Sequence, residues 1–338
     1  MKLPYGKLIT SVIGSFPLPH SFENMQRALL DQIEAGIDFP CYGQLLDMNL
    51  MFLEPLAKEG CGIAIKNGEA WIISDLKIPK KPIAIEFLEF AKDFLMKNDL
   101  FNKINGIKIP ITGPVTLSCV TKITEKNYAV EYPEFVLKFS ELVAEIAKWY
   151  DEFGAGLITI DEPGLLHALW YKMEEDAIIK AIDGSIKKIK KALPSIHVCG
   201  NIATLADILL QTKAPILCHE FKATPKNLEI YSKGKLEKAD KMIGLGCVNT
   251  NLEPRLLLDI RDKKIDWMNA VESVKEIEKT IIEGGKRFGF ERLLIVPDCG
   301  FGGMKIYFKD DTGQKIAIQK LKNMVEATRR VKEMLKTL

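Results

Sequence analysis

The chain has 338 residues, of which 47% are hydrophobic and 27% charged, and its formal net charge is +2. These values are typical of a globular protein with a sizeable core, and so small a net charge gives no reason to expect nucleic acid or anionic membranes as partners. No run approaches the roughly 18 apolar residues that a membrane span needs, and residues 1–9 lack the apolar core of a signal peptide. We therefore expect a cytoplasmic protein whose seven cysteines are reduced core residues or metal ligands.

Short apolar segments, each ended by Gly, Pro or a polar residue, recur along the chain and are typical of buried strands. There are eight of them, at residues 8–13, 37–42, 107–111, 157–160, 195–198, 216–220, 242–247 and 292–296. Most intervals between them contain segments of helical period, such as residues 133–153, 174–193 and 267–288. Eight strands that alternate with helices predict an α/β fold, a closed (β/α)₈ TIM barrel.

The interval from residue 44 to 105 is too long for one helix and predicts an insertion after the second strand. Within it, residues 62–73 are expected to form a β-hairpin, because Asn67-Gly68 supplies the two positive-φ residues of a type I′ turn. No repeat, low-complexity tract or Pro/Gly/Ser linker divides the chain. We therefore expect one domain over residues 1–338.

Four potential metal ligands lie at or just after the ends of predicted strands. They are His197 and Cys199 in one triplet, Glu220 at the end of the next strand, and Cys299 after the last one. One imidazole, two thiolates and one carboxylate suit zinc, and (β/α)₈ barrels carry their chemistry at the carboxyl ends of the strands. A thiol substrate at such a metal would lose its proton and remain nucleophilic. The sequence therefore predicts a Zn²⁺ site made of these four residues.

Five motifs occur in order, at residues 13–17, 111–116, 160–163, 197–199 and 297–300. Together this series resembles the catalytic, C-terminal half of cobalamin-independent methionine synthase, and in particular the short archaeal type, over about residues 8 to 305. The resemblance implies a (β/α)₈ barrel in which zinc activates the sulfur of homocysteine for methyl transfer. It also implies the same four zinc ligands.

The resemblance further implies that the backbone of Ile13, Gly14 and Ser15 binds the amino-acid end of homocysteine together with Asp161, which is also expected to act in catalysis. The chemistry agrees, because a carboxylate pairs with an ammonium and a glycine turn lets backbone N–H groups approach a carboxylate. Gln44 stands where the family usually has Glu, so an amide would replace one carboxylate partner of the ammonium.

Three departures from the family concern the methyl donor. The second, N-terminal half has no counterpart, a Trp that faces the folate is replaced near Cys119, and Asn251 stands where the family has His. That His delivers a proton to the folate amine, which leaves poorly without one, whereas a corrinoid leaves as cobalt(I) and needs none. These departures favour methylcobalamin or a methylated corrinoid protein as the donor, with Asn251 at the former proton-donor position.

Alternatives remain open. His197-Val198-Cys199-Gly200-Asn201 also fits zinc-dependent methylases of coenzyme M in the related uroporphyrinogen-decarboxylase superfamily. The expected function is therefore zinc-dependent methylation of L-homocysteine to methionine. Coenzyme M or another small thiol is the alternative acceptor, and 5-methyltetrahydrofolate is the alternative donor. A corrinoid- or zinc-binding protein without turnover is the alternative from outside the enzymes.

Overall fold

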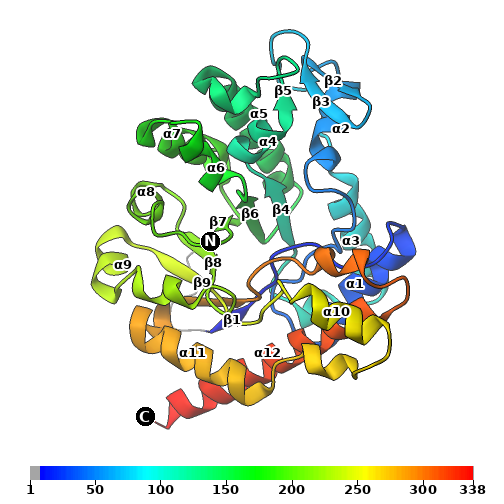
Figure 1. Ribbon diagram of the computed structural model, residues 1–338, viewed down its shortest axis with the longest axis vertical. Coiled ribbons are helices and arrows are strands. Elements are labelled where there is room, and N and C mark those ends of the chain that lie inside the picture. The colour runs from blue at the N-terminus through cyan, green and yellow to red at the C-terminus, as the bar shows by residue number, and fades with distance from the viewer. Residues whose placement is uncertain (1–7, 338) are drawn as a thin grey trace.

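The computed structural model describes residues 8–337, and its centre is a ring of strands surrounded by helices (Figure 1). Seven strands form one sheet in the order β1-β10-β9-β8-β7-β6-β4, and every neighbouring pair is parallel. Their bounds are β1 Ile9–Thr10, β4 Lys108–Thr112, β6 Leu157–Asp161, β7 Leu193–Val198, β8 Ile216–Glu220, β9 Met242–Gly246 and β10 Leu293–Val296. Each coincides with a predicted strand.

The eighth predicted strand, residues 37–42, lies between β1 and β4 and closes the ring. It pairs through single parallel bridges on either side, Ser11 with Phe39 and Cys41 with Lys108. The predicted (β/α)₈ TIM-barrel-like fold is therefore confirmed, with one wall that is joined by two bridges instead of a continuous ladder.

The reason for this weak pairing lies in the segment itself. Pro40 has no N–H to donate to a ladder. The backbone of Cys41 is bound instead by the Gln32 side chain, whose Oε1 accepts from the Cys41 N–H at 2.8 Å and whose Nε2 donates to the Cys41 carbonyl at 2.9 Å. A side-chain amide thus takes the place of a neighbouring strand.

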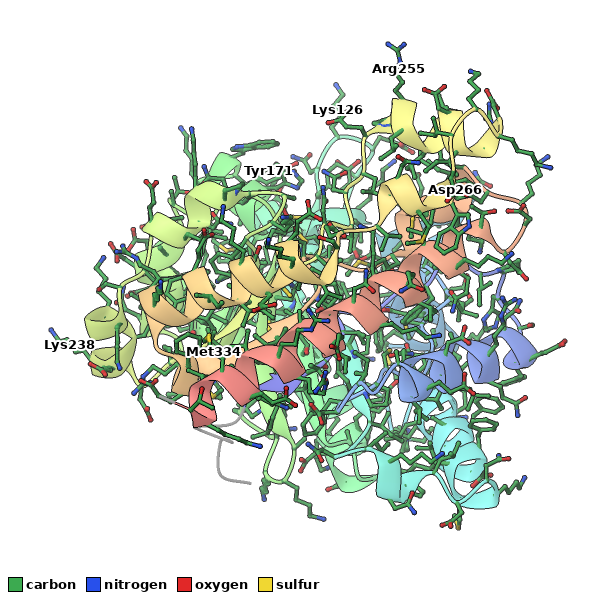
Figure 2. The ribbon with its side chains drawn as sticks, turned by 90° about the horizontal axis from the view of Figure 1, so that it is seen from below. Lys126, Tyr171, Lys238, Arg255, Asp266 and Met334 are labelled. Carbon is green, nitrogen blue, oxygen red and sulfur yellow. The ribbon has the colours of Figure 1, made fainter. Side chains whose placement is uncertain are left out.

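Helices cover the outside of the ring, and α11 and α12 lie side by side across the underside (Figure 2). The α-helices are α1 Phe22–Glu34, α2 Leu50–Lys58, α3 Glu86–Lys97, α4 Pro114–Val120, α5 Pro133–Glu152, α6 Leu165–Trp170, α7 Glu175–Ile186, α8 Ala206–Gln211, α9 Lys233–Ala239, α10 Pro254–Arg261, α11 Val274–Phe288 and α12 Thr312–Lys336. Short 3₁₀ helices span η1 Phe101–Lys103, η2 Ala129–Glu131, η3 Pro225–Glu229, η4 Trp267–Ala270, η5 Phe290–Arg292 and η6 Gly302–Ile306.

One predicted helix is interrupted. The segment 267–288 begins as the 3₁₀ helix η4, and α11 starts only after Ser273. Ser273 and Glu276 form a capping box, in which each side chain accepts a hydrogen bond from the other residue's backbone N–H. This capping box starts a new helix, although the apolar residues of segment 267–288 keep a helical spacing throughout.

The insertion after the second strand contains the predicted hairpin, seen beside β5 at the top of Figure 1. β2 Ile63–Lys66 and β3 Glu69–Ile72 are antiparallel, and Asn67 and Gly68 between them have φ of 52° and 81°. Both angles are positive, as a type I′ turn requires. The short strand β5 Thr121–Lys122, which follows α4, pairs in parallel with β3 and completes a small second sheet.

Within residues 8–337, no helix is both long enough and apolar enough to span a membrane. Residues 1–7, which belong to the segment considered above for a signal peptide, lie outside the described residues.

Candidate active site

Three of the four predicted zinc ligands come together at the carboxyl ends of β7 and β10. His197 is the penultimate residue of β7, Cys199 follows that strand, and Cys299 lies three residues after β10. His197 Nε2 is 3.0 Å from Cys199 Sγ, which is 3.5 Å from Cys299 Sγ. The three potential ligand atoms all lie within 4.8 Å of one another. Strand ends that are distant in sequence therefore form one potential metal centre.

The donor set fits zinc. Tetrahedral zinc with the usual Zn–S and Zn–N bond lengths places its ligand atoms roughly 3.5–3.8 Å apart. The distance of 3.5 Å between the two sulfur atoms agrees with this range, whereas His197 Nε2 and Cys199 Sγ, at 3.0 Å, are in direct hydrogen-bond contact and would move apart to bind the metal. The Cys199 thiol and the His197 ring hold the pKa of Cys299 well below its ordinary value, against the effect of burial. A thiolate is the form in which cysteine binds a metal.

Glu220, the fourth predicted ligand, ends β8 and is buried, but its carboxylate is not part of this three-residue group. Its Oε2 accepts a hydrogen bond from Thr224 Oγ1 at 3.3 Å. Burial and the nearby Cys299 raise the pKa of Glu220, so it lies within electrostatic reach of the thiols. Its role as a ligand stays a prediction.

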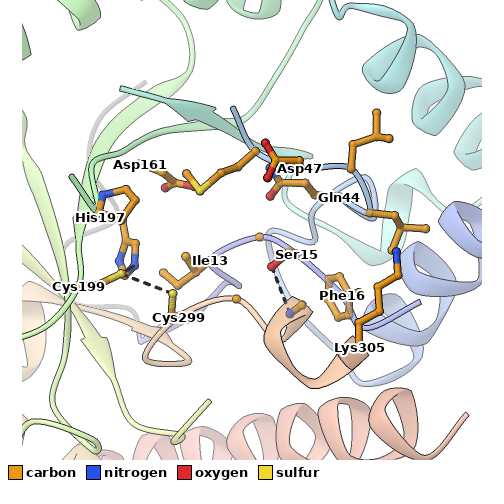
Figure 3. Close-up of a pocket in the computed structure, with 17 residues that line it drawn as sticks. Ile13, Ser15, Phe16, Gln44, Asp47, Asp161, His197, Cys199, Cys299 and Lys305 are labelled. Carbon is orange, nitrogen blue, oxygen red and sulfur yellow. Dashed lines mark hydrogen bonds between the residues drawn. The ribbon is translucent and has the colours of Figure 1, made fainter. Parts of the chain in front are cut away.

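This group of three potential ligands lines a cavity of about 370 Å³. Figure 3 shows His197, Cys199 and Cys299 at one end of this cavity, with Gln44, Asp47 and Lys305 at the other. Predicted binding residues also line the cavity: Ile13, Gly14, Ser15, Gln44 and Asp161. The structure thus gathers the predicted amino-acid site and three predicted ligands around one space.

Asp161 ends β6 directly beside His197, with which it is paired in register on β7. It is buried, its Oδ1 has no hydrogen-bond partner, and burial raises its pKa to about 6. A buried carboxylate oxygen without a partner that faces a cavity suits a cationic substrate group. The next residue, Glu162, is instead bound to the start of α4, because its oxygens accept hydrogen bonds from the backbone N–H groups of Val115 and Thr116.

The turn after β1 forms the opposite wall. A Cβ on Gly14 would lie 2.5 Å from Gln44 Oε1, so a larger residue there would displace this amide from the turn. Ser15 fastens the turn to the Cys299 loop, because its carbonyl accepts from Phe301 N–H at 2.7 Å and its hydroxyl accepts from Gly302 N–H at 3.2 Å. The turn of residues 13–15 and the loop of Cys299 are therefore one connected structure.

Sequence reasoning missed a buried cation inside the barrel. Lys108, 1% exposed on β4, donates through Nζ to the carbonyl of Ile13. Its charge opposes the effect of burial on the pKa of Asp161. A lysine within the otherwise apolar segment 107–111 was the signal that could have identified it.

The structure does not bring Asn251 to this site. Asn251 is exposed on the loop after β9, its backbone N–H donates to Asn249 Oδ1, and it is not among the residues that line the cavity. Its expected catalytic role has no geometric support here and stays a prediction.

Comparison with known proteins identifies the family. The family profile described as "Cobalamin-independent synthase, Catalytic domain" matches residues 23–330. The chain belongs to this family. Proteins named methionine synthase from Methanothermobacter thermautotrophicus and Methanocaldococcus jannaschii are each 29% identical to it, over 95% and 96% of this chain and 99% and 100% of the relatives.

Solved structures show the same fold. A B12-independent methionine synthase from a Shewanella species, in complex with selenomethionine, has a TM-score of 0.72 at 17% identity and covers 98% of this chain and 100% of that chain. A methyltransferase from Methanosarcina mazei has a TM-score of 0.61 at 17% identity, covering 97% and 95%. These structures show the fold alone. The family match over residues 23–330 and the methionine synthase relatives make the chain a methyltransferase of the cobalamin-independent methionine synthase type, so the alternative of a binding protein without turnover is wrong.

The family corrects the expected donor. Methylcobalamin, or a methylated corrinoid protein as partner, was inferred from Asn251, from the missing Trp near Cys119 and from the lack of a counterpart to the N-terminal half, but the matching family is cobalamin-independent. The inference equated the loss of one proton donor with the loss of folate chemistry. An acid elsewhere in the cavity can protonate a leaving nitrogen equally well, so these departures do not identify the donor.

Proposed function

We propose that the chain transfers a methyl group to the sulfur of L-homocysteine and so produces methionine. The observation that carries this proposal is the group of His197, Cys199 and Cys299 at the end of a cavity whose wall holds the unpartnered Asp161 carboxylate. The three potential ligands suit a thiol, and the neighbouring Asp161 suits the ammonium of an amino acid. Homocysteine has both groups.

At the sulfur end, His197, Cys199 and Cys299 would hold zinc, with Glu220 as the fourth ligand, and one of the four would give way to the substrate thiol. Zinc bound there would lower the pKa of the substrate thiol while the two thiolates keep its sulfur electron-rich. The protein's own contribution is orientation. The ligands project from strand ends of a rigid barrel and fix where the sulfur lies relative to an incoming methyl group.

At the amino-acid end, Asp161 would accept the ammonium and the turn of Ile13, Gly14 and Ser15 would receive the carboxylate. Lys108 supports this arrangement, because it holds the Ile13 carbonyl from inside the barrel. The Shewanella relative of the same fold was solved with selenomethionine, an analogue of the product. Coenzyme M has no amino group for Asp161, which favours homocysteine over that alternative.

For the donor we propose 5-methyltetrahydrofolate, the cobalamin-free alternative. A second cavity of about 520 Å³ adjoins the first, and Asp47 lines both. Tyr128, Tyr171 and the aliphatic Val120 line the second cavity, and such side chains suit a flat heterocycle. Asp47 lies at the end of the first cavity away from the thiols, so a donor bound in the second cavity would have to extend into the first to bring its methyl group to the sulfur.

One assay tests both parts. Zinc-loaded protein would be offered homocysteine or coenzyme M, each with methyltetrahydrofolate or methylcobalamin, and the methylated thiol would be measured by mass spectrometry. We expect methionine from homocysteine with the folate. Methylation of coenzyme M in preference to homocysteine would refute homocysteine as the acceptor. Turnover with methylcobalamin but not with methyltetrahydrofolate would refute the folate as the donor.

A further inference from the structure

Two buried polar side chains connect the three loops that carry the proposed metal ligands. Asn227, in η3, is fully buried, and Asp298, directly before Cys299, is 1% exposed. Neither belongs to the three-residue metal group, and neither lines the substrate cavity. Their hydrogen bonds all reach backbone beside the ligands.

Asn227 joins the loop after β7 to the end of β8. Its Nδ2 donates to the carbonyl of Gly200 at 2.9 Å and to the carbonyl of Glu220 at 2.7 Å, while its Oδ1 accepts from Ile202 N–H at 3.3 Å. Gly200 is the residue after Cys199. The Asn227 side chain therefore fixes the backbone at Glu220 and next to Cys199.

Asp298 joins the loop after β8 to the loop after β10. Its Oδ1 accepts the N–H groups of Phe221 and Lys222, both at 3.0 Å, and its Oδ2 accepts that of Ala223 at 2.6 Å. Glu220 precedes these three residues, and Cys299 follows Asp298. The carboxylate thus fixes the spacing between Glu220 and Cys299.

The need for such links follows from the barrel. Parallel ladders end at the last residue of each strand, and the register of β8 with β9 ends at Glu220. Beyond that point the backbone groups need other partners if they are buried. Asn227 and Asp298 provide these partners. Asn227 connects the loop after β7 to the end of β8, and Asp298 connects the loop after β8 to the loop after β10.

We propose that Asn227 and Asp298 are positioning residues that hold Cys199, Glu220 and Cys299 in their metal-binding arrangement before the metal arrives. The proposal rests on the proposed zinc site and deepens it. A site whose loops are already ordered loses less conformational entropy on binding, so its affinity is higher than that of the same ligands on free loops. Residues that orient metal ligands typically account for about 10–100-fold in affinity.

The test compares full-length Asn227→Ala, Asn227→Asp and Asp298→Asn with wild type. Ser140→Ala is the matched control, because Ser140 is buried and links α5 to α7 through one hydrogen bond to the Ala181 carbonyl. Zinc affinity would be measured by competition with a chelator, thermal midpoints on metal-free protein, and the Co²⁺ complex by its thiolate charge-transfer absorption.

We expect Asn227→Ala to weaken zinc binding about 10–100-fold. At saturation, its Co²⁺ complex should keep the two-thiolate absorption of wild type, because both cysteines remain. Asn227→Asp should be weaker still, since its carboxylate would face the carbonyls of Gly200 and Glu220. Ser140→Ala should lower the thermal midpoint and leave the affinity unchanged.

Unchanged affinity in the folded variants, with zinc bound by wild type, would overturn the positioning role and leave the proposed function intact. An affinity loss in Ser140→Ala equal to that in Asn227→Ala would also overturn it, because the effect would then follow stability alone. If wild type binds no zinc, the proposed metal site and this inference fail together. If Asn227→Ala does not fold, Asn227→Asp and Asp298→Asn, which are nearly isosteric with the wild-type residues, allow the same comparison of zinc affinity.

Discussion

The two ends of the active-site region are built differently. The proposed metal end consists of His197, Cys199 and Cys299 at or just after strand ends, where His197 is buried and the two cysteines are partly exposed. The second cavity, where we propose that the donor binds, is lined by the insertion hairpin, α2, α4 and the residue after α6, and it includes exposed residues such as Asp47 and Tyr171. A barrel fixes chemistry where its strands end, whereas loops supply the part that can change between relatives.

The largest expected effect is at the metal end. Cys199→Ser or Cys299→Ser should each remove most of the bound zinc, expected at about one per chain, and abolish methyl transfer, because a thiolate ligand is lost. Metal analysis after dialysis checks this. Cys61→Ser is the control, since Cys61 is a buried free thiol outside the cavity. Full zinc content in both ligand variants would refute the assignment.

Asp161→Asn should have the next largest effect. Loss of a charge-assisted hydrogen bond to the ammonium should weaken homocysteine binding by about 1.5–3 kcal/mol. Zinc content should stay at the wild-type level. Isothermal titration with homocysteine, and with a thiol that lacks the amino group, measures the discrimination. If the variant discriminates between the two thiols as well as wild type does, Asp161 binds something else.

The same carboxylate predicts a pH dependence. Burial raises the pKa of Asp161 to about 6, so the charged form that binds ammonium is lost as the pH falls through that value. kcat/KM for homocysteine, which reports groups of the free enzyme, should therefore decrease below about pH 6. In Asp161→Asn this decrease should be absent. Its persistence in the variant would assign the titration to another group.

A smaller effect is expected at the donor end. Tyr171→Ala should raise KM for the folate several-fold, corresponding to about 0.5–1.5 kcal/mol for a lost aromatic contact. KM for homocysteine should not change. Trp170→Ala is the matched control, because this neighbour is 76% exposed and is not among the residues lining the second cavity. Equal effects of the two variants would argue against a folate site there.

The smallest effect is expected for Asn251→Ala. Its side chain is exposed and away from the cavity, so stability and turnover should change by less than about 0.5 kcal/mol. Steady-state kinetics with each donor checks this. A large loss of kcat would restore the catalytic role that the sequence suggested and would require the loop after β9 to move toward the cavity.

The strands, the hairpin and the ligand triplet could be predicted from sequence because each is a local pattern. Apolar runs of four to six residues located β4, β6 and β7, and Asn67-Gly68 located the turn. The contacts of Asn227 and Asp298 could not be predicted in this way. They join segments up to 77 residues apart, and a single polar residue in a loop carries no periodicity.

The replacement of a strand by the Gln32 side chain gives the barrel wall an unequal resistance to opening. Around most of the ring, separating two strands breaks several ladder hydrogen bonds at once. On either side of residues 37–42, single backbone hydrogen bonds replace the ladder, such as Phe39 N–H to the Thr10 carbonyl and Lys108 N–H to the Pro40 carbonyl, and Gln32 binds both backbone groups of Cys41. Fewer backbone hydrogen bonds break when this segment opens locally, so we expect its amides to exchange faster than those of the continuous ladders. Gln44 follows this segment, so local opening would reach the proposed amino-acid site before it reached the strand ends that carry the thiols.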